Sequence, residues 1–237
     1  MNRSSRMDRV AVVFAMAFPT AAAWAYFVVF ADRAFMPFLY TAAKIVQFSF
    51  PAVWVIAIRR KRVYRKYPRS AALFPGMLSG LALAVGMAAV YWGFFRGSLP
   101  AAAVSRIAAR VEAFGVTTPF TYLLMAVGFS VVHAFLEEYY WRWFVFGELR
   151  GMFGSTAGIA LSSIAFMSHH VIVLGVFLGP GSFWTMAPWL SLGVAGAGAF
   201  WAWLYHRSGG LAGPWLSHML VDLAIFAIGY DLIRTIN

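Results

Sequence analysis

The sequence predicts an all-α protein in which about seven helices, between six and eight, cross a membrane as one bundle. Three observations lead to this fold class. The 237 residues are 62% hydrophobic and only 11% charged, whereas soluble domains are about half apolar and about a quarter charged. Apolar runs of about 20 residues, the length that crosses a bilayer, recur along the whole chain. Many of the basic residues gather in one short segment between two of these runs.

The apolar runs, in chain order, are 10–31, 36–58, 71–95, 119–145, 155–178, 183–205 and 211–230. Each is long enough to cross the bilayer as a helix, and the run 119–145 is long enough to tilt or to extend beyond it. No long linker divides the chain, so we expect one integral-membrane domain over residues 1–237. Residues 1–118 would hold the first spans and a basic loop, and residues 119–230 the later spans.

The first apolar run resembles a signal peptide in two respects. Arg3, Arg6 and Arg9 precede it, and residues 21–23 are three alanines that resemble a cleavage site. The apolar stretch continues to Ala31, however, and is then long enough to span a bilayer. We therefore interpret this run as an uncleaved first helix.

The positive charge indicates an orientation. Seven of the 19 Lys and Arg residues lie in RRKRVYRKYPR, residues 59–69, between two apolar runs. Basic loops between spans are typically cytoplasmic, so we expect this loop and the N-terminus in the cytoplasm, with the loop close to anionic lipid headgroups. No nucleic-acid-binding motif accompanies the net charge of +11, so we expect no nucleic-acid partner.

Two further patterns concern packing. Residues 100–116, PAAAVSRIAARVEAFGV, have helical spacing of charged against apolar positions, which predicts either an amphipathic helix in the membrane interface or an ordinary connecting helix. Small residues recur at Gly76 and Gly80, at Gly154 and Gly158, and over residues 193–199. Small residues four apart allow helices to pack closely in lipid.

Ionisable residues inside membrane spans are rare and commonly functional. Here they are Lys44, His133, Glu137, Glu138, Arg142, His169, His170, His218 and Asp222. Lys44 lies near one end of its span, where its long side chain can reach the interface. The other eight lie on three of the predicted spans, all in the second half of the chain.

Helical spacing divides the roles of the two adjacent carboxylates. Glu138 and Arg142 are four residues apart and can form an ion pair, while Glu137 points about 100° away from Glu138. His133, four residues before Glu137, can hydrogen-bond it. This leaves Glu137 free for chemistry.

The histidines of the later spans can complete the site. His169 and His170 are adjacent and cannot face the same direction, so we expect at most one of them to join Glu137. His218 and Asp222 are four apart and share a helix face.

A carboxylate with imidazoles can activate water for hydrolysis, with or without a metal. Two histidines and a carboxylate can also bind zinc, although the H-E-x-x-H zinc motif is absent. The chain has no cysteine, which excludes a cysteine protease and any thiolate-bound metal. The same residues could instead serve a carrier, but the halves show no internal repeat, and this favours one catalytic site.

Three short motifs on separate spans resemble those of a known family. They are E-E-x-x-x-R at Glu137–Arg142, F-x-x-x-H at Phe166–His170 and H-x-x-x-D at His218–Asp222. Together and in this order they resemble the CPBP intramembrane proteases, the group that includes the type II CAAX prenyl endopeptidases and the bacterial Abi proteins. The resemblance covers residues 119 to 230, and the first three spans match nothing specific.

The resemblance implies a role for each motif residue. Glu137 would activate water together with His170, and Glu138 would pair with Arg142. His218 and Asp222 would orient groups or stabilise the oxyanion.

His133 and Phe166 would be supporting residues, and His169 would either support the catalytic residues from behind or serve packing. Asp222 departs from the pattern of eukaryotic members, which have Asn at this position, and a carboxylate is a better metal ligand but a poorer oxyanion donor.

The resemblance implies no cofactor, with zinc as the alternative, held by Glu137, His170, His218 and Asp222. Its partners would be the lipid bilayer and a membrane-associated protein or peptide substrate. Peptide maturation, bacteriocin immunity and processing of C-terminal sorting signals all remain open. The composition is typical of a bacterial protein, so we expect the inner membrane. The alternatives are a proton- or ion-coupled carrier that uses Glu137, His170 and Asp222, and a non-catalytic immunity or scaffold protein.

Overall fold

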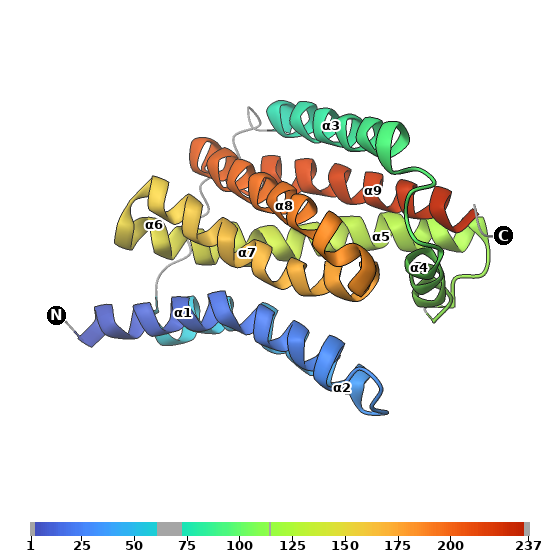
Figure 1. Ribbon diagram of the computed structural model, residues 1–237. Helices are drawn as coiled ribbons and strands as arrows, with labels where there is room; N and C mark the ends of the chain where they lie inside the picture. The colour runs from blue at the N-terminus through green and yellow to red at the C-terminus, as the bar shows by residue number, and fades with distance from the viewer. Residues whose placement is uncertain (1–2, 61–72, 114, 235–237) are drawn as a thin grey trace.

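The computed structural model describes residues 3–60, 73–113 and 115–234. Within these residues every regular element is a helix, and most of the predicted basic loop, 61–69, lies outside them. The elements are α1 (Arg3–Trp24), η1 (Ala25–Val29), α2 (Met36–Ala52), η2 (Val53–Ile58), α3 (Leu73–Val90), η4 (Tyr91–Phe95), α4 (Ala101–Ala113), α5 (Pro119–Glu138), η5 (Tyr139–Phe146), α6 (Gly147–Phe153), α7 (Ser155–Leu178), α8 (Pro180–Ser208) and α9 (Ala212–Arg234), where η marks π-helical segments. The long helices run alongside one another, and α4 lies across one end (Figure 1).

Among the described residues, six helical segments are long and apolar enough to cross a membrane. They are Arg6–Val29, Met36–Ile58, Leu73–Phe95, Pro119–Phe153, Ser155–Leu178 and Ala212–Arg234. The seventh predicted span, 183–205, lies in the 29-residue helix α8, whose tryptophans and glycines dilute its apolar residues. The predicted all-α bundle of about seven spans is thus confirmed, and the fourth span extends beyond the predicted residue 145 to Phe153.

The segment formed by α5 and η5 changes from an α-helix to a π-helix directly after the two adjacent carboxylates. Thr118 starts it: its hydroxyl accepts from the backbone N–H of Thr121, and Pro119 occupies the first helical position. The helix then changes from α to π between Glu138 and Tyr139. π-helical turns hold an extra residue and frequently occur at functional sites. The change follows directly after the two adjacent carboxylates.

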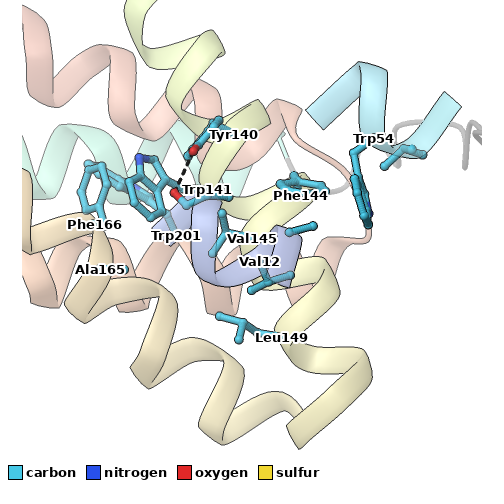
Figure 2. Close-up of a cluster of buried hydrophobic side chains, with 13 residues drawn as sticks. Val12, Trp54, Tyr140, Trp141, Phe144, Val145, Leu149, Ala165, Phe166 and Trp201 are labelled. Carbon is cyan, nitrogen blue, oxygen red and sulfur yellow. Dashed lines mark hydrogen bonds between the residues drawn. The ribbon is translucent and has the colours of Figure 1, made fainter. Parts of the chain in front are cut away.

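The largest buried cluster centres on η5. Trp141 and Phe144 are at most 1% exposed, and the hydroxyl of Tyr140 donates to the carbonyl oxygen of Ala15 in α1 at 2.7 Å. Figure 2 shows this cluster reaching from Trp54 of η2 to the aromatic side chains of α7 and α8. The first two helices are thereby attached to the part of the chain that holds the three motifs.

Close packing of α3 on α9 sets the position of the last motif. A Cβ atom at Gly80 would lie 2.8 Å from the Cα of Ser217, which is closer than packed side chains allow. Gly76 meets the backbone of Gly213 in the same way. The small residues four apart therefore serve helix packing, as their spacing predicted, and His218 follows directly after this contact.

The amphipathic segment forms α4 and is attached to the bundle. Val104 packs into a buried cluster with residues of η4 and α9. Arg106 donates through Nε to the carbonyl oxygen of Phe177 at 3.2 Å and through Nη2 to that of Leu178 at 3.1 Å. Because the last carbonyl groups of a helix lack partners within it, Arg106 caps α7 and holds α4 across the end of the bundle.

Candidate active site

Three imidazoles from three helices surround the carboxylate of Glu137. Glu137 ends α5 and is 1% exposed. Its Oε1 lies 3.6 Å from Nε2 of His133 on the same helix and 3.6 Å from Nε2 of His169 on α7. Its Oε2 lies 3.8 Å from Nε2 of His218 on α9. These distances are slightly longer than hydrogen bonds, as is common for catalytic groups before substrate binds.

The neighbouring carboxylate has two basic partners. Glu138 is fully buried, and its Oε2 lies 3.2 Å from Nε of Arg142, the ion pair that the four-residue spacing predicted. Its Oε1 lies 2.8 Å from Nδ1 of His218. Arg142 is held in turn over the ring of Phe166, 4.6 Å from the ring centroid. Glu138 therefore links the first motif to the third and is already occupied by charge partners, whereas Glu137 is not.

Both adjacent histidines lie close to Glu137, whereas the sequence predicted that at most one of them would. One nitrogen of His169, one nitrogen of His170 and one oxygen of Glu137 all lie within 4.8 Å of one another. Nδ1 of His170 lies 2.9 Å from the carbonyl oxygen of Phe166. The rings lie at 45° with centroids 4.1 Å apart, so they converge although their Cα–Cβ bonds diverge. His169, expected either to support the catalytic residues or to serve packing, thus lies beside Glu137.

The third motif brings the last two predicted residues together. Nε2 of His218 lies 3.6 Å from Oδ1 of Asp222, one turn further along α9. Asp222 is 8% exposed. The imidazole of His218 therefore has Glu138 at its Nδ1 and both Asp222 and Glu137 at its Nε2. All eight residues predicted from the sequence as catalytic or supporting, Glu137, His170, His218, Asp222, Glu138, Arg142, His133 and Phe166, belong to one connected cluster.

Two tryptophans, which the motifs do not include, hold the imidazoles from the side. Trp201 of α8 stacks on His218 with centroids 3.9 Å apart and planes at 15°. Trp141 of η5 lies parallel to His169, with centroids 5.6 Å apart. Figure 2 shows both indoles beside Phe166. The sequence held no signal for them, because each lies four residues before the end of its predicted run, where tryptophans are common in membrane proteins.

Lys44 is also placed differently from the expectation. Its ammonium group donates to Oε1 of Gln47 at 3.3 Å, one turn further into the span, rather than extending toward the near end at Met36. The reason is packing: the rings of Tyr40 and Phe48 lie 5.7 and 5.6 Å from the ammonium and hold it in place.

The donor chemistry of the site suits a metal ion. Among the described residues the group with converging ligand atoms is Glu137, His169 and His170, and carboxylate oxygen and imidazole nitrogen are ligands that zinc accepts. This set differs from the predicted one, because it contains His169 in place of His218 and Asp222. A zinc ion held by these three residues would supply an activated water.

Comparison with known families agrees with the motifs. Residues 119–224, a little under half of the chain, match the model of the family described as type II CAAX prenyl endopeptidase Rce1-like. The match includes all three motifs and confirms the resemblance to the CPBP group over this region. It indicates a membrane protease of the CAAX-endopeptidase type. Searches of the curated proteins and of the solved structures find no match to the chain.

Proposed function

We propose that this chain, which contains the Rce1-like region of a membrane protease, hydrolyses a peptide bond in a membrane-associated protein or peptide, with water activated by Glu137. One observation supports this above the others. A buried carboxylate, without a charge partner closer than 3.6 Å, faces imidazole nitrogens from three helices. Polar groups that only hold helices together do not need a carboxylate surrounded by imidazoles. A general base does, because it must stay free to accept a proton.

The proposed reaction begins when water attacks the carbonyl carbon of the scissile peptide bond. Glu137 accepts the water proton as the C–O bond forms, and the carbonyl oxygen becomes an oxyanion. When the tetrahedral intermediate collapses, the C–N bond breaks and Glu137 returns the proton to the leaving nitrogen. Tight burial of the carboxylate keeps this proton within the site.

The adjacent histidines receive different parts in this proposal. The Nδ1–H of His170 donates to the carbonyl oxygen of Phe166, which leaves its Nε2 as an acceptor for the water. Nε2 of His169 faces Oε1 of Glu137 at 3.6 Å and would orient the carboxylate, and the parallel indole of Trp141 fixes the His169 ring. His170 thus helps to activate water, and His169 is a positioning residue.

The third motif would stabilise the oxyanion. His218 donates through Nδ1 to Glu138, which fixes its ring, and its protonated Nε2 would donate to the oxyanion. Asp222 lies beside the same Nε2 and orients it. Preorganised donors at a developing oxyanion are among the largest contributions to catalysis.

The proposal also covers the membrane in which the protein lies and whether it needs a metal. We place the chain in a bacterial inner membrane with its N-terminus in the cytoplasm, as the basic segment 59–69 indicates. Hydrolysis would need no metal, because Glu137 and the histidines supply the base and the donors themselves. Processing of membrane-anchored proteins near their C-termini fits the family description.

Terminal-peptide mass spectrometry on host membranes tests the proposal. We compare the wild type with Glu137→Gln, which keeps the shape of the side chain and removes the base. We expect a set of membrane-associated proteins to keep an uncut end only in the variant, and His170→Ala to give the same set. Identical peptide ends in wild type and Glu137→Gln, with equal protein levels, would reject proteolysis and leave the carrier and scaffold alternatives.

A further inference from the structure

A second polar group in the membrane interior belongs to the N-terminal half, outside the Rce1-like region. It consists of Lys44 and Gln47 on α2. Gln47 is 3% exposed and accepts the Lys44 ammonium at its Oε1. Its Nε2 is buried and has no hydrogen-bond partner. The group thus presents unsatisfied N–H donors from two side chains.

This donor pair lies beside the candidate active site. The ammonium of Lys44 is 5.6 Å from the ring of Phe48, and that ring meets Tyr140, three residues after Glu137, edge to face at 6.2 Å. The rings of Phe48 and Tyr140 therefore connect the donor pair on α2 to the segment that follows Glu137.

The pair has no anion of its own. In the described part of the chain no carboxylate lies within 4.0 Å of the Lys44 ammonium. An unpaired ammonium inside a membrane span is costly, and an unpaired buried amide adds to this cost. Ionisable groups inside membrane spans commonly mark functional sites.

We propose that Lys44 and Gln47 form a subsite that binds a carboxylate of the substrate beside Glu137. An ammonium and an amide N–H₂ on neighbouring turns can each donate to one oxygen of a carboxylate. The carboxylate is either the free C-terminus of the substrate or an acidic side chain near the scissile bond. The subsite rests on the proposed function and deepens it, because it restricts the substrates to peptides that bring a carboxylate close to the cut.

Binding probes test the subsite independently of cleavage. The full chain with Glu137→Gln, solubilised in detergent, is titrated with N-dodecanoyl-Gly-Leu-Leu as free acid and as C-terminal amide. A second pair carries Asp or Asn in the middle position and an amide end. We expect one acidic probe to bind roughly tenfold or more tightly than its neutral counterpart, the gain typical of a charge-assisted hydrogen bond. The pair that shows the preference identifies the source of the carboxylate.

Two substitutions decide whether Lys44 and Gln47 cause the preference. Lys44→Met removes the ammonium and should abolish it, while Lys44→Arg should keep part of it. Gln47→Glu keeps the size of the side chain and gives Lys44 a partner within the helix. If Lys44 is purely structural, the protein tolerates this change and its probe binding is unaltered. If Lys44 binds the ligand, the carboxylate introduced at position 47 takes the place of the ligand. We therefore expect Gln47→Glu to fold normally and to lose the preference for the acidic probe.

The outcomes separate this inference from the proposed function. Equal binding of acid and neutral probes, or a preference that survives both Lys44→Met and Gln47→Glu, overturns the subsite. In the otherwise wild-type chain, a fall of kcat that is equal for acidic and neutral substrates on Lys44→Met would show that Lys44 acts on Glu137 instead. Carboxylate binding without any cleavage in the wild type would retain the subsite and reject the protease.

Discussion

The indole of Trp201 lies flat against the imidazole of His218, with ring centroids 3.9 Å apart and planes 15° from parallel. The indole is fixed in turn, because its Nε1–H donates to the hydroxyl of Ser217 at 3.0 Å. His218 is therefore held on its face by Trp201 and at its Nδ1 by Glu138. A ring held in this way can donate in one direction only, which is what an oxyanion donor requires.

Trp201 is buried in the core cluster, so replacing it with Ala should lower both stability and catalysis. We expect Trp201→Ala to reduce kcat/KM about tenfold, the upper range of an aromatic stacking contribution, and Trp201→Phe to retain most of the activity. Cleavage of an identified substrate and thermal unfolding are measured together. Trp203→Ala, on the same helix and 47% exposed, is the matched control. Equal losses for both substitutions would contradict a role for the stack.

The ion pair between Glu138 and Arg142 should stabilise the bundle. Each residue is at most 1% exposed, so Glu138→Gln or Arg142→Met leaves a buried charge uncompensated. We expect each change to lower the free energy of unfolding by about 3–5 kcal/mol, and the double variant to recover part of this loss. Unfolding in detergent measures the effect, with exposed Glu112→Gln as the control. Unchanged unfolding in both single variants is the result that rejects the pair.

The close contact of α3 with α9 should control the position of the third motif. A side chain at Gly80 collides with the backbone at Ser217, next to His218. We expect Gly80→Ala to cost about 1–3 kcal/mol of stability and to reduce cleavage, because α9 must move. Gly86 on the same helix has open space around it, so Gly86→Ala should leave both quantities unchanged. A harmless Gly80→Ala would show that α9 tolerates the shift.

Metal removal tests whether Glu137 suffices as the base. We expect the purified protein to keep its activity after dialysis against phenanthroline, since the proposed mechanism uses the chain's own residues. Metal content is measured by mass spectrometry before and after dialysis. Stoichiometric zinc in the active protein, with activity lost on dialysis and restored by zinc, would instead assign Glu137, His169 and His170 as zinc ligands.

The sequence alone determined the features that depend on local geometry. Apolar length predicted the spans, and four-residue spacing predicted that Glu138 meets Arg142 and that His218 lies near Asp222. The helical period is the same wherever a helix lies, so such pairs need no knowledge of the fold. The three motifs also marked the site residues, although their catalytic roles remain predictions.

Only the tertiary structure decided which groups meet across helices. It brought both His169 and His170 to Glu137, stacked Trp201 on His218 and turned Lys44 inward toward Gln47. These contacts depend on how far apart the helices pack and how each is rotated about its axis. Those quantities are set by small residues such as Gly80 and by large ones such as Trp141, which act together across the bundle, so no single stretch of sequence contains them.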